Sequence, residues 1–579
     1  MSKMVVSRPD GSKKFPFTSF KQVQKAIRVN AGSKITVILR GGVYELSETL
    51  IFTDEDTSLP STEVEITSYP GEKVTISGGR KIKEQWIKQR SNIWKLKLKG
   101  YNPGKDYFRT LYVDNQPLTR ASSDTLFSTG PLPQYAKSFK KYDFKAIEKL
   151  RKDSLDAFCG FKYVSKALNS LYDISSAEVI VYNSWEASWH TIRDIDKKNS
   201  IITFNNPATY PVGFFAPRLR FRVENSLDFL KHAGEWVLAS ASGEIYYHAY
   251  PGQNPNDYEF TIPNLDTLIL LKGNEQKKRH VQNISFSNLN FSYTSAAWGK
   301  SNLKEDVKAF NSIKFPYLDF SQGFSSAQAA LDCGEAILFE WAKNCTFTNC
   351  NFSNLGNYAI RIGKYSNDNI ISDSQISNIG GGGIIIGFNV SGGKRKSIPD
   401  KMSPSGNKIL RCQISKCGQI FPASVGIGIM QANNSLIKHN TVFDLPYTGI
   451  SVGWSYSFAD TYTINNLIEY NTIYSVMKIL ADGGGIYTLG KQTGSVFRGN
   501  HIRDIFRSPN AVGSTNNGFF FDEGSSDFRV DSNIVLNIQN KDIRFNKTDT
   551  TRIKFGPNHF EKSSFNDTLL KLKLGSPIR

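Results

Sequence analysis

The fold is decided by the stretch Gly426-Ile427-Gly428-Ile429, which returns 23 residues later as Gly449-Ile450-Ser451-Val452. The same phrase, a small residue followed by a short apolar strand, recurs on both sides of this stretch. The other copies are Ala336-Ile337-Leu338-Phe339, Ala359-Ile360-Arg361-Ile362, Gly383-Ile384-Ile385-Ile386, Gly485-Ile486-Tyr487-Thr488 and Gly518-Phe519-Phe520-Phe521. Successive copies are about 23 to 43 residues apart, a spacing typical of solenoid repeats. We therefore expect an all-β protein, a right-handed parallel β-helix in which each copy is one strand of a coil.

A second phrase favours the same fold. It is an Asn followed by alternating apolar residues, as in Asn283-Ile284-Ser285-Phe286 and Asn434-Ser435-Leu436-Ile437. Further asparagines stand where the coils would turn, at Asn354, Asn378, Asn440, Asn471, Asn500 and Asn533. Because Asn tolerates a left-handed backbone, we expect these residues to form a stacked ladder at the corners of the coils.

Alternation within the first phrase assigns its residues to two faces. The first and third residues after the small one should point inward, as Ile384 and Ile386 do in one copy. The second and fourth should point outward, in one column of Leu338, Arg361, Ile385, Gly428, Ser451, Tyr487 and Phe520 and another of Glu340, Gly363, Gly387, Met430, Gly453, Leu489 and Asp522. The glycines leave the backbone open to a flat ring, so we predict an exposed groove on this face.

The rest of the chain is expected to form a cap and an insertion. Residues 1–100 should be an N-terminal cap with the first coils, including a short helix capped by Thr18 or Ser19. Residues 101–265 have no fixed period and carry aromatic-rich strands, which indicates an inserted β-sandwich-like domain with a helical stretch between Lys137 and Ser170. Residues 266–579 should form the main parallel β-helix with the active-site face.

Composition and charge limit the partners. The chain has 579 residues and a formal net charge of +19, so its field favours an anionic partner. Lys and Arg are spread along the chain without a nucleic-acid-binding motif, and no run of about 18 apolar residues occurs, so we expect neither nucleic acid nor a membrane as partner. Six cysteines without a CxxC pair make a zinc site improbable, and we expect no metal and no cofactor.

Three acids stand out at the ends of two successive copies of the phrase. Asp482 precedes a run of three glycines, and Asp522 with Glu523 ends the next copy. Hydrolysis of a glycosidic bond needs two carboxyl groups, one as proton donor and the other as nucleophile or as base for water. Neighbouring coils could bring these acids together. The alternative for each acid is a turn residue that accepts hydrogen bonds from its own backbone.

Four further residues are candidates for substrate binding. Arg361 could bind sulfate or carboxylate, and Trp454 and Tyr487 could stack on a sugar ring. Glu335 flanks the first strand and could assist binding. The alternatives are a solvated surface arginine and local packing of the two aromatic residues between coils.

Several phrases resemble those of the β-helix glycoside hydrolases of family 141 and, more distantly, of family 120. They are Pro9-Asp10-Gly11, Gly41-Gly42-Val43-Tyr44, Tyr69-Pro70-Gly71-Glu72, Gly234-Glu235-Trp236, Gly449-Ile450-Ser451-Val452-Gly453-Trp454, Asp482-Gly483-Gly484-Gly485-Ile486-Tyr487-Thr488 and Asp522-Glu523-Gly524-Ser525. The resemblance implies a β-helix interrupted by a β-sandwich insertion, with fucosidase, xylanase or xylosidase activity. It implies that Asp482 and Asp522 are the catalytic acids, with Glu523 beside the second.

Together these features lead us to expect a glycoside hydrolase for a polysaccharide or oligosaccharide. The basic charge favours an anionic or sulfated glycan. With the resemblance in view, we expect that glycan to contain fucose, galactose or xylose. The start Met1-Ser2-Lys3-Met4 lacks the apolar core of a signal peptide, yet large glycans are met outside the cytoplasm, so we expect a secreted or periplasmic protein. Two alternatives stay open: a polysaccharide lyase for a uronate-containing glycan, and a glycan-binding adhesin without catalysis.

Overall fold

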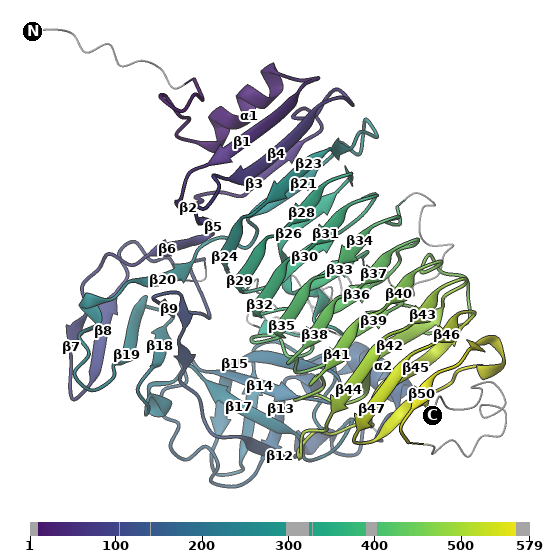
Figure 1. Cartoon of the computed structure of the whole chain (residues 1–579). Helices are drawn as coiled ribbons and strands as arrows, with labels where there is room; N and C mark the ends of the chain where they lie inside the picture. The colour runs from purple at the N-terminus through teal and green to yellow at the C-terminus, as the bar shows by residue number, and fades with distance from the viewer. Residues whose placement is uncertain are drawn as a thin grey trace, which may run out of the picture.

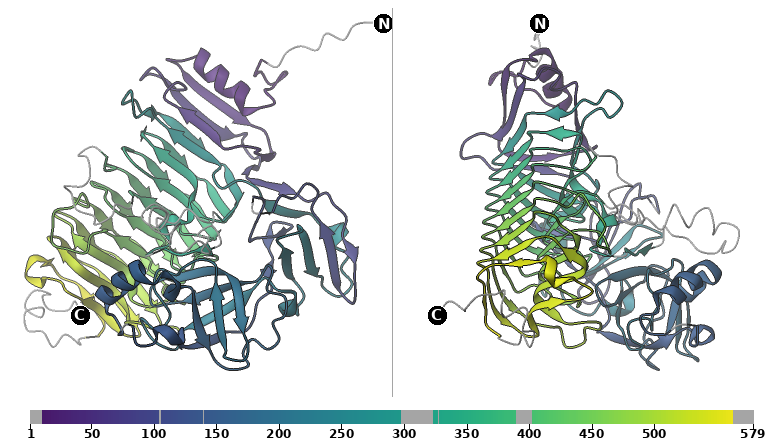
Figure 2. Two further views of the ribbon diagram at one scale, coloured as in Figure 1. Left: turned by 180° about the vertical axis from the view of Figure 1, so that it is seen from behind. Right: turned by 90° about the vertical axis from the view of Figure 1, so that its right-hand side faces the viewer.

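The computed structural model describes residues 10–103, 105–138, 140–296, 323–326, 328–388 and 402–562. The segment Met1–Met4, where a signal peptide was considered, lies outside them. In the described residues the chain forms a long parallel β-helix, and an insertion made mainly of antiparallel strands folds back beside its later coils (Figures 1 and 2). No helix among the described residues has the length and apolarity needed to cross a membrane.

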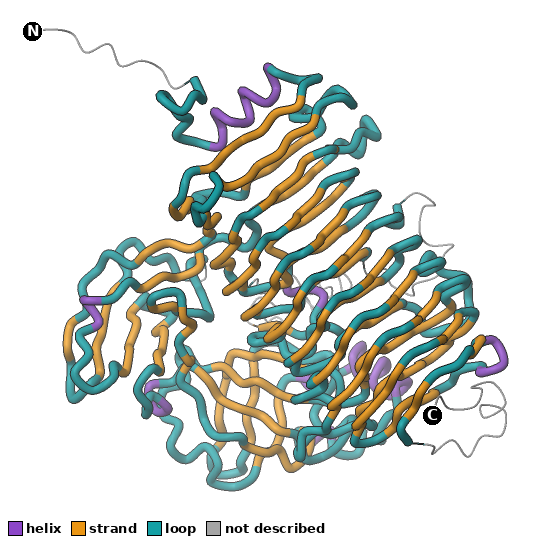
Figure 3. The backbone as a smooth tube through the Cα atoms, in the orientation of Figure 1, coloured by secondary structure: helices purple, strands orange, loops and turns teal. Residues whose placement is uncertain are grey.

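Three parallel sheets, sheets A, B and C, make up the β-helix, and a typical coil adds one strand to each (Figure 3). Sheet A contains β1 (Lys34–Leu39), β4 (Glu63–Ser68), β23 (Ile284–Ser287), β28 (Thr346–Thr348), β31 (Ile370–Ser372), β34 (Lys408–Leu410), β37 (Leu436–Lys438), β40 (Leu467–Glu469), β43 (Val496–Arg498), β46 (Arg529–Asp531) and β49 (Lys554–Phe555). Sheet B contains β2 (Gly42–Glu45), β5 (Val74–Ser77), β24 (Asn290–Thr294), β29 (Asn351–Leu355), β32 (Gln375–Ile379), β35 (Gln413–Cys417), β38 (Thr441–Phe443), β41 (Thr472–Tyr474), β44 (His501–Ile505), β47 (Ile534–Ile538) and β50 (His559–Phe560). Sheet C contains β3 (Leu50–Thr53), β21 (Ile269–Lys272), β26 (Glu335–Glu340), β30 (Tyr358–Ile362), β33 (Ile384–Ile386), β36 (Ile427–Ile429), β39 (Ile450–Val452), β42 (Gly483–Lys491), β45 (Asn516–Ser526) and β48 (Lys541–Phe545). A small parallel pair, β22 (Val281–Gln282) with β27 (Ala342–Lys343), lies at a corner between coils.

The helices are few and short. The helix α1 (Phe20–Val29) begins after Ser19, whose hydroxyl accepts the N–H of Gln22, so Ser19, one of the two predicted residues, caps this helix. The helix α2 (Phe144–Asp153) occupies part of the stretch from Lys137 to Ser170 that was predicted to be helical. Short 3₁₀ helices are η1 (Pro133–Tyr135), η2 (Leu155–Phe158), η3 (Leu227–Phe229), η4 (Pro255–Asp257), η6 (Leu331–Cys333) and η8 (Thr550–Arg552).

The insertion consists of two small sheets and a closed ring of strands. One sheet contains β6 (Gly79–Lys81), β9 (Tyr112–Val113), β10 (Gln116–Pro117) and β20 (Phe260–Pro263), and the other β7 (Ile87–Lys88), β8 (Ile93–Lys97), β11 (Thr119–Arg120), β18 (Glu235–Ala239) and β19 (Glu244–His248). The ring consists of β12 (Leu126–Pro131), β13 (Gly160–Tyr163), β14 (Glu178–Tyr182), β15 (Ala187–Asp196), β16 (Ile201–Phe204) and β17 (Arg220–Glu224), and β25 (Gly323–Phe324) pairs with β15. Three strands that precede residue 101 therefore pair within the insertion. The division into 1–100, 101–265 and 266–579 stays a prediction.

The interior of the β-helix follows the predicted alternation. The inward-facing Ile384, Ile386, Ile450, Val452 and their counterparts from β21 to β45 are buried, whereas Phe545 on β48 is partly buried. The six cysteines are also buried, with free thiols. Each coil alone would leave its apolar face in water, and stacking in register buries these faces as one continuous core.

The outward columns of sheet C differ from the prediction of an exposed groove. Ile385, Tyr487 and Phe520 are buried although they point away from the interior. The guanidinium of Arg544, one coil further on, stacks over the Phe520 ring at 4.1 Å, and Arg361 donates to the carbonyl of Leu331 in the segment before β26. The groove prediction is therefore wrong for most of this face, because side chains and crossing segments cover it.

Buried asparagines connect successive coils at one corner, as predicted. The side-chain amide of each donates to the side-chain oxygen of the next at 2.9 to 3.0 Å, in the order Asn440, Asn471, Asn500, Asn533 and Asn558. At this corner the left-handed backbone conformation is adopted by the residue before each asparagine, for example His439 and Tyr470. Asn354 and Asn378, at another corner, are left-handed themselves.

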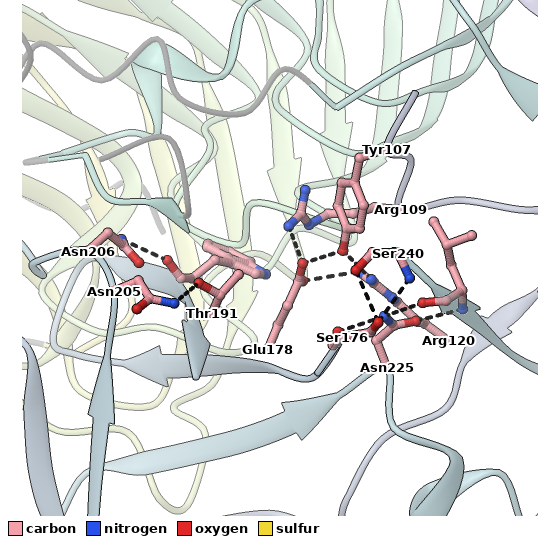
Figure 4. A network of polar contacts seen from close by, with 12 residues as sticks. Tyr107, Arg109, Arg120, Ser176, Glu178, Thr191, Asn205, Asn206, Asn225 and Ser240 are labelled. Carbon is pink, nitrogen blue, oxygen red and sulfur yellow. Dashed lines mark hydrogen bonds and ion pairs between the residues drawn. The ribbon is translucent and has the colours of Figure 1, made fainter. Parts of the chain in front are cut away.

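A buried ionic network joins the two halves of the insertion (Figure 4). Glu178 on β14 accepts hydrogen bonds from Arg109 at 2.6 Å and from Arg120 at 3.1 Å, and Tyr107 donates to the same carboxylate. All three charged side chains are buried, so removing one would leave uncompensated charge in the interior. The network fixes the strand ring relative to the small sheet that contains β11.

The asparagine ladder predicts a large effect on stability from one side chain. Asn500→Ala removes the acceptor for the backbone N–H of Asn471 and the donor to the carbonyl of Ile468, and both groups are buried. Each buried polar group left unpaired costs about 1 to 3 kcal/mol. We expect Asn500→Ala to lower the free energy of unfolding by about 3 kcal/mol, measured by urea denaturation.

A matched control is Asn351→Ala, whose partly exposed amide donates to Asn290 on the outside of sheet B. This change should alter the free energy of unfolding by less than about 0.5 kcal/mol. Equal effects of the two substitutions would contradict a structural role of the buried ladder.

Candidate functional site

The candidate site lies on the outer face of sheet C, where β42, β45 and β48 are neighbours. The register places Tyr487 beside Phe520 and Phe520 beside Arg544. Two residues further along, Leu489 pairs with Asp522, and Asn546 follows β48. Tyr487, Phe520 and Arg544 thus form one column across three coils. Leu489, Asp522 and Asn546 form the next column on the same face.

Asp522 is held by donors from both neighbouring coils. The Tyr487 hydroxyl donates to Oδ2 at 2.7 Å, and the side-chain amide of Asn546 donates to Oδ1 at 2.6 Å. Burial raises the pKa of Tyr487 well above its usual value, and the charge on Asp522 raises it further, so this phenol stays protonated as a donor. Two donors aimed at two oxygens suit an ionised carboxylate.

Asp482 lies in a different environment at the start of β42. Its backbone is left-handed, with φ of +61°, which an Asp tolerates at a turn. Arg544 Nη1 donates to Oδ1 at 2.8 Å, and the hydroxyl of Tyr447 donates to the backbone carbonyl of Asp482 at 3.2 Å. Burial raises the pKa of Asp482, the Arg544 guanidinium opposes that rise, and the charge on Asp522 adds to it.

The partners of the two aspartates lie two residues apart in the chain, at the end of β48. Arg544 binds Asp482 and Asn546 binds Asp522. The Cα atoms of Arg544 and Asn546, two residues apart in the chain, are therefore about 7 Å apart. The effect of the Asp522 charge on the pKa of Asp482 agrees with this closeness. The candidate site therefore holds two carboxyl groups with different surroundings, and both bind residues of the same coil.

Glu523 and three of the four binding candidates make contacts of their own. Glu523 is next to Asp522 in sequence and pairs with Lys547 at 2.5 Å at a more exposed edge. Glu335 and Arg361 form an ion pair with each other at 2.9 Å, on β26 and β30, which are separated from β42 by further coils. Trp454 is buried and packs with the main core, so little of its ring is available for stacking on a sugar.

Four residues of the site were missed from the sequence. Arg544 and Asn546 belong to one further copy of the repeat, in which Asp542 stands 24 residues after Gly518. This spacing is within the range of the other copies, so the repeat could have revealed it. Tyr447 and Tyr456 precede and follow the strand β39, and the Tyr456 hydroxyl donates to Gln328 at 2.7 Å. Nothing in the local sequence marks these two tyrosines as neighbours of the acids.

No cluster of three or more His, Cys, Asp or Glu side chains arranged to hold a metal ion occurs in the part of the chain that the structure describes. The site consists instead of two aspartates, tyrosine hydroxyls, one amide and one guanidinium. This donor and acceptor set is suited to proton transfer and to hydrogen bonds with hydroxyl groups.

Comparisons with known proteins agree with the fold. Residues 335–535 match the family model described as "Right handed beta helix region". A solved structure named "Glycoside hydrolase" is similar at 20% identity with a TM-score of 0.78, over 98% of this chain and 96% of that chain. The solved complex of XylC with xylose is similar at 12% identity with a TM-score of 0.47, over 93% of this chain and 84% of that one. No curated protein sequence matches the chain. The predicted right-handed parallel β-helix with an additional domain is therefore confirmed.

Proposed function

We propose that the protein is a glycoside hydrolase that cleaves a polysaccharide or oligosaccharide by acid/base catalysis with Asp482 and Asp522. The observation that carries the proposal is the pair of aspartates in unequal environments on one face of the β-helix. Paired carboxyl groups in such enzymes are about 5 to 9.5 Å apart, and one of them has a raised pKa. The likeness to a structure named as a glycoside hydrolase agrees with this proposal.

The environments of the two acids support separate roles. Asp482, whose pKa burial raises, is proposed as the proton donor to the leaving oxygen. Asp522, held by Tyr487 and Asn546, is proposed as the nucleophile or as the base that activates water. Tyr487, predicted as a stacking residue, is proposed instead to orient Asp522 through its hydroxyl.

An anionic or sulfated glycan is the proposed substrate class. The net charge of +19 attracts anions over the whole molecule, and both Arg544 and Arg507 act electrostatically on groups around Asp482. Because such glycans occur outside cells, we propose a secreted or periplasmic location.

The acid pair predicts a loss of turnover when either carboxyl is replaced. Asp482→Asn and Asp522→Asn should each lower kcat by about 10²- to 10⁴-fold, since general acid–base catalysis contributes that much. The measurement is chromatography of the products from a panel of sulfated, uronate-containing and neutral glycans. Full activity in both variants would refute the site.

Asp444→Asn is the matched control, because this aspartate also forms an ion pair, with Lys478, but lies on the side of sheet B. Its activity should equal that of the wild type. Products that absorb in the near ultraviolet would identify a lyase instead, and binding of a glycan without any product would identify an adhesin.

The pH dependence of activity follows from the contact between Asp482 and Arg544. The guanidinium lowers the pKa of Asp482, so Arg544→Gln should raise that pKa further. A proton donor with a higher pKa stays protonated to higher pH. The alkaline limb of the pH profile of kcat/KM should therefore move to higher pH.

Arg544→Lys keeps a positive charge and should shift the limb less than Arg544→Gln does. Thermal unfolding of both variants will report any loss of the stacking on Phe520. An alkaline limb that stays in place, or moves to lower pH, in Arg544→Gln would exclude Asp482 as the proton donor.

A further inference from the structure

Two exposed tyrosines come from different parts of the chain, and both parts pack against the coils that carry Asp482 and Asp522. Tyr456, in the turn after β39, is 55% exposed, and Tyr142, in the insertion just before α2, is 40% exposed. Large aromatic side chains are often buried, and exposed ones near the polar groups of a proposed site indicate a binding surface.

Tyr142 is held in place in spite of an unfavourable backbone. Its φ is +59°, in the left-handed region that a bulky residue rarely adopts. Its N–H donates to the carbonyl of Phe214 at 3.2 Å, and its ring packs edge-on against Phe214 and Phe215, with centroids 6.0 and 5.7 Å away. Strained residues that the surroundings hold fast are often functional.

The insertion is fixed to the coil that carries Asp482, so Tyr142 has a defined position relative to the acids. The backbone N–H of Ala481 donates to the carbonyl of Ser184, in the turn between β14 and β15, at 2.8 Å. Arg220 on β17 donates to the carbonyl of Ile479 at 2.7 Å. The strand ring thus lies directly against the later coils of the β-helix (Figure 2).

Contacts place each tyrosine beside a chain segment that carries one of the acids. Phe215, against which Tyr142 packs, also packs edge-on against Trp185 with ring centroids 4.7 Å apart, and Trp185 follows Ser184, which accepts the N–H of Ala481. Ser457, which follows Tyr456, lies so close to Gly524 that a side chain there would meet its carbonyl, and Gly524 is two residues after Asp522.

The electrostatic effects agree with these contacts. Burial raises the pKa of Tyr142, the charge on Asp482 raises it further, and Arg507 and Arg544 oppose the rise. For Tyr456, burial of the hydroxyl raises the pKa, with additional contributions from Tyr210, Asp522 and Glu523. Tyr142 is therefore on the Asp482 side of the site and Tyr456 on the Asp522 side.

We propose that Tyr142 and Tyr456 are the sugar-stacking residues of the site, and that each packs against the apolar C–H face of a pyranose ring on one side of the acid pair. The inserted domain then supplies one subsite and the β-helix supplies the other. A tyrosine offers a wide apolar face with few rotatable bonds, so ordering it on a sugar costs little entropy. This inference rests on the proposed function, and it replaces the buried Trp454 as the candidate for stacking.

The test is the affinity of the protein for glycans after removal of each ring. For an oligosaccharide that the wild type cleaves, Tyr142→Ala and Tyr456→Ala should each raise KM about 10-fold with little change in kcat, a loss of about 1.4 kcal/mol of binding. Tyr142→Phe and Tyr456→Phe keep the ring and should restore KM. Tyr172→Ala is the control, because Tyr172 is 79% exposed in the insertion and packs with Lys197 away from the acids.

Calorimetric binding of the same glycans to the Asp482→Asn variant separates this inference from the proposed function, because binding needs no turnover. Weaker binding when either tyrosine is also changed to Ala supports the inference even if the wild type hydrolyses nothing in the panel. Unchanged binding and unchanged KM in the Ala variants, or no glycan bound at all, would overturn it. Hydrolysis that persists with unchanged KM in those variants would leave the proposed function intact.

Discussion

The hydrogen-bonded stacking of one coil on the next is the constraint on which the rest of this structure depends. Parallel strands set residues from successive coils about 4.8 Å apart, and buried asparagines such as Asn471 and Asn500 hold the corners in register. Tyr487, Phe520 and Arg544 become neighbours only through this register. A shift of one residue in the register of a single coil would turn Asp522 away from Tyr487 and Asn546, and the hydrogen bonds of the candidate site would be lost.

The side chains of Asp482 and Asp522 are chemically identical, but their surroundings in the folded protein differ. Asp482 is enclosed between the start of β42 and the insertion, where loss of water raises its pKa and Arg544 limits the rise. Asp522 receives two hydrogen bonds from neighbouring coils. The insertion contributes to this difference, because its contacts with Ala481 and Ile479 close one side of the site. The β-helix supplies the spacing of the acids, and the insertion helps to set their environment.

Much of the site could be found in the sequence because the repeat is local. The acids Asp482 and Asp522, and Tyr487, stand at recurring positions of one phrase. In the structure Tyr487 binds Asp522, and Asp482 binds Arg544 of a neighbouring coil. Arg361, Glu335 and Trp454 occupy similar positions but lie in an ion pair or in the core. Their roles could not be separated from the sequence, since an outward position in a strand does not reveal what covers it.

The sequence by itself determined the inward face of the β-helix, because alternation along a strand is a local property that burial of apolar residues enforces. Only the tertiary structure decided that Phe520 and Ile385 are covered, that Arg544 reaches Asp482, and that the insertion, which carries Tyr142, packs against the coil of the same acid. These contacts join segments far apart in the chain. Their geometry depends on the number of coils between the partners and on how the insertion folds back, and no short stretch of sequence records either.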